Sequence, residues 1–208
     1  MKKNALLLPI FLSALFGAVL GGAVIFFSIS STTPSQNDLI RDFYLTENAV
    51  HVSPHTLRKK MDKGEKDFIL VDLRSSQEYE KSHIIGAINI PAYIDPNTSV
   101  SLDKDKEQKE RIIKEFNKLA SAEKDIIVYC YSIPCMTGRK IGKLLAENGL
   151  YVKHLGIGWN EWRYFWNLWN HDGETPTKFE DYIIGGRDPG VPKISENPSP
   201  CAEGELGC

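Results

Sequence analysis

The chain has 208 residues, 42% of them hydrophobic and 25% charged, a composition typical of one globular domain with extensions. The formal net charge is only −2, and basic and acidic residues are interspersed, so we expect no surface for nucleic acid. The four cysteines and five histidines lack the spacing of a zinc site, so we expect neither a metal nor another cofactor.

The first thirty residues form a separate apolar segment. No charged side chain occurs from Ala5 until Asp38. About 20 such residues in a helix cross the hydrocarbon core of a bilayer, so we predict a transmembrane anchor over residues 1–30. A cleaved secretion signal, which usually has a shorter apolar stretch, is the alternative. Because Lys2 and Lys3 precede the segment, the positive-inside rule places the remainder outside the cytoplasm, on the periplasmic side.

A linker is predicted over residues 31–51, where the chain first becomes polar and contains a proline. The globular domain is expected over residues 52–170 and opens with a short helix. Ser53 offers an N-cap for this helix, Pro54 suits its first position, and Gly64 marks its end.

Four apolar runs in this domain predict the strands of a mainly parallel sheet. A run that is apolar throughout is typical of a strand covered on both faces. Helical patterns separate the runs, and strands that alternate with helices indicate an α/β fold with helices flanking a central sheet. The expected strands are residues 68–71, 87–90, 125–130 and 151–155.

Three further helices are predicted between these strands. Ser75 and Glu78 have the spacing of a capping box and indicate a brief helix. Residues 101–124 are densely charged but carry apolar residues at helical spacing, which indicates a surface helix. The last helix lies after the third strand and is expected to end at Gly149.

Residues 158–170 contain four tryptophans at three- and four-residue spacing. We interpret them as the core-facing side of a helix, and contact with a membrane interface is the alternative. The segment 171–208 is rich in proline and glycine, so an irregular tail is expected. Cys201 and Cys208 in this tail can form a stabilising disulfide, or a redox relay if they exchange with other cysteines.

Two more cysteines flank a loop at the end of the third predicted strand. Cys130 follows that strand, and Cys135 precedes the next helix. The N–H groups of such a loop and the start of a helix lower the pKa of a thiol, and they favour the nucleophilic thiolate. Gly138 relieves crowding in the loop, while Arg139 and Lys140 add positive charge that suits an anionic substrate.

Two stretches resemble the rhodanese, or thiosulfate sulfurtransferase, family. The stretch "ILVDLRSSQEYEKSHIIGAINIPAY" at residues 69–93 is similar to the family signature, in which an aspartate and an arginine end a strand. The stretch "IIVYC" matches the strand that delivers the family's catalytic cysteine, and "LLAENGLYVKHLGIGWNEW" resembles the segment after the family's active loop. The resemblance covers about residues 52–168 and implies a rhodanese-like α/β domain.

The resemblance also implies an activity. A thiolate of this family attacks sulfane sulfur of a small anionic donor such as thiosulfate, becomes a persulfide, and passes the sulfur to a thiol acceptor. By position Cys130 is the sulfur carrier. Asp72, Arg74 and His83 belong to the structural signature of the family, so we assign them to the scaffold.

The loop itself departs from the family pattern, because Gly138 and Arg139 follow Cys130 at a greater distance than usual. Measured from Cys135, "CMTGRK" resembles another form of the loop, so Cys135 competes as the nucleophile. Cys135 can instead resolve a persulfide on Cys130, or the two cysteines can form a disulfide in an inactive or thiol-disulfide redox domain. Neither cysteine has the spacing to an arginine that phosphatases of this fold require.

Overall fold

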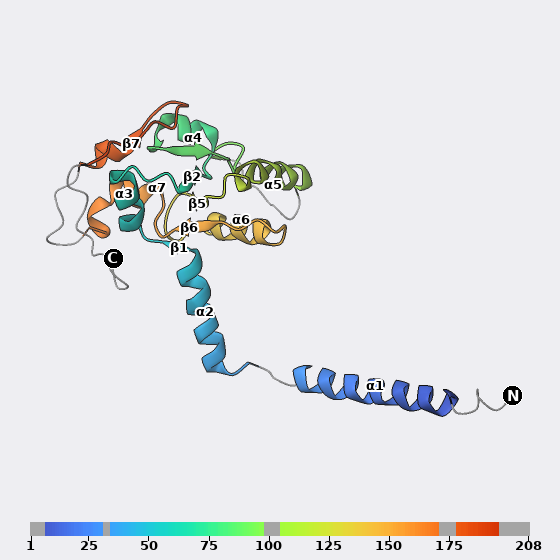
Figure 1. The fold of residues 1–208 in the computed structure, drawn as a ribbon. Helices are drawn as coiled ribbons and strands as arrows, with labels where there is room; N and C mark the ends of the chain where they lie inside the picture. The colour runs from blue at the N-terminus through green and yellow to red at the C-terminus, as the bar shows by residue number, and fades with distance from the viewer. Residues whose placement is uncertain (1–6, 31–33, 98–104, 171–177, 196–208) are drawn as a thin grey trace. The chain divides into compact units, whose positions relative to one another are not determined.

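The computed structural model of the protein divides into two units, Met1–Thr46 and Glu47–Cys208 (Figure 1). The described residues are 7–30, 34–97, 105–170 and 178–195.

The N-terminal unit consists of helix α1 (Leu7–Ser30) and most of helix α2 (Gln36–Val50). Among the residues whose side chains are described, no helix is both long and apolar enough to cross a membrane. The anchor predicted over residues 1–30 is thus not supported by the structure. The predicted linker 31–51 contains a helix that the sequence analysis missed, and the side chain of Ser35 caps it by accepting a hydrogen bond from the Asp38 N–H.

The second unit is built on a parallel sheet with the strand order β1-β6-β5-β2-β4. Its central strands, β2 and β5, pair from Phe68 with Asp125 to Asp72 with Tyr129. All four predicted strands are confirmed, and a two-residue edge strand, β1, was missed. The strands are β1 (His51–Val52), β2 (Phe68–Asp72), β4 (Ala87–Asn89), β5 (Asp125–Tyr129) and β6 (Lys153–Leu155).

Three predicted helices begin or end at the expected residues, whereas the surface helix predicted over residues 101–124 already ends at Ala120. Ser53 caps α3, and Ser75 forms a complete capping box with Glu78 at the start of α4. Gly64 and Gly149 follow helices with φ angles of +67° and +74°, which glycine adopts without steric cost. The helices are α3 (Pro54–Asp62), α4 (Ser76–Lys81), α5 (Lys106–Ala120), α6 (Thr137–Ala146) and α7 (Trp159–Tyr164).

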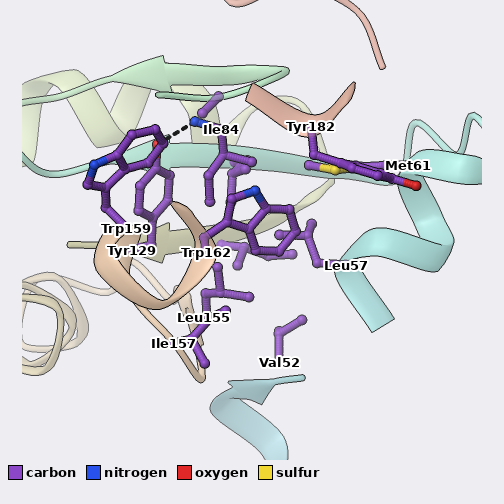
Figure 2. Close-up of a cluster of buried hydrophobic side chains, with 13 residues drawn as sticks. Val52, Leu57, Met61, Ile84, Tyr129, Leu155, Ile157, Trp159, Trp162 and Tyr182 are labelled. Atoms are coloured by element: carbon purple, nitrogen blue, oxygen red, sulfur yellow. Dashed lines mark hydrogen bonds between the residues drawn. The ribbon is translucent and has the colours of Figure 1, made fainter. Parts of the chain in front are cut away.

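Helices cover both faces of the sheet and create two cores. Alternate residues of the central strands point to opposite faces: Val71 and Val128 pack against residues of α5 and α6, whereas Leu70 and Ile127 pack against residues of α3 and α7. Figure 2 shows the second core, in which Trp162 lies fully buried among aliphatic and aromatic side chains.

The four tryptophans of residues 158–170 pack against the core as predicted, but their segment is not one continuous helix. Trp159 and Trp162 are buried, and Trp166 and Trp169 pack partly buried against the same core. Phe165 has non-helical angles (φ −123°, ψ 41°), so α7 ends there and a short 3₁₀ helix, η1 (Trp166–Leu168), follows. The core interpretation of these tryptophans is therefore confirmed, and the predicted length of their helix is wrong.

Part of the predicted irregular tail is ordered on the domain. Residues Phe179–Tyr182 form a 3₁₀ helix, η2, and β7 (Ile183–Ile184) pairs antiparallel with β3 (His83–Ile84). Tyr182 is buried, and its hydroxyl donates to an Asp62 carboxylate oxygen at 2.5 Å. Cys201 and Cys208 lie outside the described residues, so their pairing stays a prediction.

Candidate active site

The two-cysteine loop connects the carboxyl end of β5 to the start of α6, and the start of α7 holds it in place. The N–H of Trp159 donates to the carbonyl of Cys130, and the N–H of Asn160 donates to the carbonyl of Tyr131, each at 2.8 Å. Within the loop, the N–H of Cys135 donates to the carbonyl of Ser132 at 3.0 Å. This turn folds the chain back, so that both cysteines belong to one site.

Gly158, the N-cap of α7, and Glu161 in the first turn of α7 both contact the loop. A Cβ at Gly158 would lie only 2.2 Å from the backbone nitrogen of Ser132, so no larger residue fits there. The buried Glu161 carboxylate accepts hydrogen bonds from the N–H of Ile133 at 3.3 Å and of Gly158 at 2.9 Å. Neither residue was predicted from the sequence, although their spacing is that of an N-cap and N3 pair.

The two cysteines differ in exposure. Cys130 is 1% exposed and belongs to the core on the α5–α6 side, and its Sγ lies 3.8 Å from the Cys135 carbonyl oxygen. Cys135 is only half-buried. Both are free thiols, so the loop disulfide considered from the sequence is not formed in the structure.

The cysteines also differ in proton affinity. A hydrogen bond from the Cys130 thiol lowers the pKa of Cys135 to about 5, and this shift is assisted by the Thr137 hydroxyl and by the backbone groups of Thr137 and Tyr131. The same hydrogen bond, together with burial, raises the pKa of Cys130. The two pKa shifts have opposite directions, and they favour negative charge on the half-buried Cys135 over the buried Cys130.

Two hydroxyl groups complete the surroundings of Cys135. Tyr93, which follows β4, forms a hydrogen bond with the hydroxyl of Thr137 at the start of α6. Burial raises the pKa of Tyr93, and the neighbouring Cys135 adds to that rise. The rings of Tyr93 and Tyr131 meet edge to face at 5.4 Å, and the Tyr131 hydroxyl donates to Glu78 at 2.5 Å. No sequence pattern pointed to these tyrosines, because they come from separate segments.

A comparison with protein families matches residues 53–164 to the rhodanese-like domain family, over more than half of the chain. The protein belongs to this family. A curated relative, the HTH-type transcriptional regulator Rv0324 of Mycobacterium tuberculosis, is 30% identical over 109 residues. These are 51% of this chain and 38% of that regulator, so the match spans about two fifths of the relative's length.

Solved structures include similar chains. The BH2092 protein of Bacillus halodurans is 25% identical, with a TM-score of 0.47, and the match covers 74% of this chain and 88% of that one. A thiosulfate sulfurtransferase of Pseudomonas aeruginosa is 16% identical with a TM-score of 0.40, and the match covers 55% of this chain and 18% of that one.

The three residues predicted to bind substrate have different positions in the rhodanese-like domain. Gly138 is buried, and a Cβ there would lie 2.4 Å from the ring of His154, whose pKa burial lowers to about 4. Arg139 donates to the Ile133 carbonyl at 3.4 Å, and Lys140 is exposed on α6. Gly138 thus relieves crowding as predicted. The largest influences on the pKa of Cys135 are hydrogen bonds and burial, and a substrate-binding role for the two cations stays a prediction.

The residues assigned to the scaffold of the rhodanese-like domain are buried. The carboxylate of Asp72 and the guanidinium of Arg74 form an ion pair at 2.6 Å, and Arg74 also lies 4.2 Å from the centre of the Trp159 ring. The ring of His83 stacks on Tyr79. Within the described ranges, no group of three or more His, Cys, Asp or Glu residues is arranged to hold a metal ion. These contacts agree with the scaffold assignment.

The lowered pKa of Cys135 predicts how alkylation depends on pH. Iodoacetamide reacts with the thiolate, so its rate with Cys135 is expected to fall as pH drops through about 5 and to be constant near neutrality. An ordinary cysteine has its midpoint near pH ~8.5. The rate is measured by mass spectrometry of the loop peptide after timed quenching. A midpoint near that of an ordinary cysteine would contradict the lowered pKa of Cys135.

Proposed function

We propose that the rhodanese-like domain is a sulfurtransferase that carries sulfane sulfur as a persulfide on Cys135. The observation that supports this most is a half-buried free cysteine just before the start of α6, where hydrogen bonds from the Cys130 thiol and from Thr137 lower its pKa. The sequence favoured Cys130 by position. We prefer Cys135 because Cys130 is 1% exposed, so a donor in solution cannot reach its sulfur atom, and because its hydrogen bond to Cys135 and its burial raise its pKa.

In the first half-reaction, the Cys135 thiolate attacks the outer sulfur of a small anionic donor such as thiosulfate. A bond forms between Sγ and that sulfur, the sulfur–sulfur bond of thiosulfate breaks, and sulfite leaves with the electron pair. In the second half-reaction, an acceptor thiolate or cyanide attacks the terminal sulfur of the persulfide. Cys135 then leaves as a thiolate, which the Cys130 thiol and Thr137 stabilise again.

Mass spectrometry of the loop tests this proposal. The reduced full-length protein is incubated with thiosulfate, blocked with an alkylating agent, and digested. Lys124 and Arg139 bound a tryptic peptide that contains both cysteines, so fragment ions between Cys130 and Cys135 locate the added sulfur. At short incubation times we expect it on Cys135. Sulfur on Cys130 would return the carrier to the residue favoured by the sequence. A loop that gains no sulfur at any time and keeps both cysteines as thiols would reject the sulfurtransferase.

We also propose that residues 1–30 attach the domain to a membrane and leave it on the periplasmic side. The support is the absence of charged residues from Ala5 until Asp38, after Lys2 and Lys3. The full-length chain is expected in the membrane fraction of cells after an alkaline carbonate wash. The double substitution Leu15→Arg and Val19→Arg should move it to the soluble fraction. A wild-type chain that is washed off the membrane would reject the anchor.

A further inference from the structure

We propose that Cys130 resolves the persulfide on Cys135, so that the domain releases sulfide and closes a Cys130–Cys135 disulfide. This activity rests on the proposed function, because it begins with the loaded Cys135. It differs from transfer to an external acceptor, since the second thiol belongs to the same loop.

The first support is the position of the two sulfur atoms. The Cys130 thiol donates a hydrogen bond to the Cys135 carbonyl oxygen at 3.8 Å, and hydrogen bonding between the two side chains is the first cause of the shifted pKa of each thiol. The turn from Cys135 back to Ser132 brings the two residues together despite the four residues between them. A disulfide needs Cα atoms within about 7 Å, which neighbouring thiols on one tight turn can meet with a small adjustment.

The second support is that backbone groups of the loop stabilise negative charge on either sulfur atom. The backbone groups of Thr137 and Tyr131 stabilise negative charge on Cys135. Those of Gly138 and Ser132 do the same for Cys130. A thiolate can therefore be held at either sulfur, but not at both, because two like charges on neighbouring side chains repel strongly.

Loading of Cys135 changes which sulfur carries the charge. The pKa of Cys130 is raised above all by its hydrogen bond to Cys135, and the charge on Cys135 contributes as well. In the persulfide the negative charge lies on the outer sulfur, one bond further away, so this cause weakens while the amides of Gly138 and Ser132 remain. Cys130 is thus protected from reaction in the resting site and becomes a nucleophile once the site is loaded.

The resolving step is balanced. The Cys130 thiolate attacks Sγ of Cys135 and forms the disulfide bond, and the bond between Sγ and the outer sulfur breaks. The outer sulfur leaves with the electron pair and takes up the proton that Cys130 lost, which gives hydrosulfide. With thiosulfate as donor, two thiols are oxidised to one disulfide while the sulfane sulfur is reduced to sulfide and sulfite is released. A dithiol reductant returns the loop to two thiols.

A single-turnover experiment on the full-length protein tests this step. The protein is reduced, freed of reductant and mixed with thiosulfate, and released sulfide and protein thiols are measured together. We expect one sulfide per chain, loss of two thiols, and a Cys130–Cys135 disulfide in the peptide map. In Cys130→Ala and Cys130→Ser we expect a stable persulfide on Cys135 and loss of sulfide release.

The chain offers a matched control for this experiment. The double variant Cys201→Ser with Cys208→Ser removes the other two cysteines and is expected to release sulfide like the wild type. Sulfide release that persists in both Cys130 variants, or depends on Cys201 and Cys208, would overturn the inference while leaving the persulfide on Cys135 intact. Absence of a persulfide in every variant would instead overturn the proposed function. If both Cys130 variants fold poorly, the wild-type peptide map still tests the inference, because a Cys130–Cys135 disulfide must appear in it together with the released sulfide.

Discussion

Replacement of Cys135 by serine is expected to abolish sulfur transfer. The rate of thiocyanate formation from thiosulfate and cyanide should fall by at least about 10³-fold, because a serine hydroxyl does not ionise near neutrality and cannot hold a persulfide. The substitution exchanges one half-buried sulfur for oxygen, so the thermal unfolding midpoint is expected to stay close to that of the wild type. Activity and unfolding are measured on the same preparation.

Comparison of Cys135→Ser with Cys130→Ala shows which of the two cysteines carries the sulfur. It removes the hydrogen bond that does most to lower the pKa of Cys135, so the midpoint of the pH–rate profile should move upward from about 5. Transfer to cyanide is expected to persist at alkaline pH, where Cys135 still ionises. If Cys130→Ala is inactive at every pH while Cys135→Ser retains transfer, Cys130 is the sulfur carrier and the assignment from exposure is wrong.

The elements that could be predicted from the sequence are the central strands, whose residues point alternately into the core on each face of the sheet. The central strands β2 and β5 are apolar along most of their length because α-helices cover both faces, and this pattern is visible in the sequence. β1, β3 and β7 have two residues each, too few to show any alternation. The pairing of Ile184 with His83 depends on tertiary packing, so the ordered part of the tail could not be predicted.

The candidate site likewise has features that the sequence could predict and features that it could not. A cysteine-bearing loop between a buried strand and a helix could be located from the sequence, and Gly138 was correctly linked to crowding. The choice between Cys130 and Cys135 depends on exposure, which is fixed by a turn inside the loop and by contacts from α7. Tyr93 approaches Thr137 from 44 positions away in the sequence. Neither relation leaves a local pattern in a single sequence.

Gly158→Ala is expected to displace the two-cysteine loop. The new Cβ would lie 2.2 Å from the nitrogen of Ser132 and 2.4 Å from the carbonyl carbon of Tyr131, and backbone atoms cannot rotate aside as a side chain can. We expect the free energy of unfolding to fall by about 2–3 kcal/mol. Because the amides around Cys135 move with the loop, the pKa of Cys135 should rise toward that of an ordinary cysteine, and sulfur transfer at neutral pH should decrease.

Gly142→Ala separates this effect from the general consequence of adding a methyl group. Gly142 lies within α6, and its new Cβ would lie 3.8 Å from Cγ2 of Val152, an ordinary contact. Alanine also favours a helix over glycine by up to about 1 kcal/mol, so this variant should be as stable as the wild type or more so. Chemical denaturation and the pH dependence of alkylation are compared for both variants. If Gly158→Ala unfolds like the wild type and keeps the low pKa of Cys135, then close packing on α7 does not hold the loop, and the thiolate must be stabilised from within the loop alone.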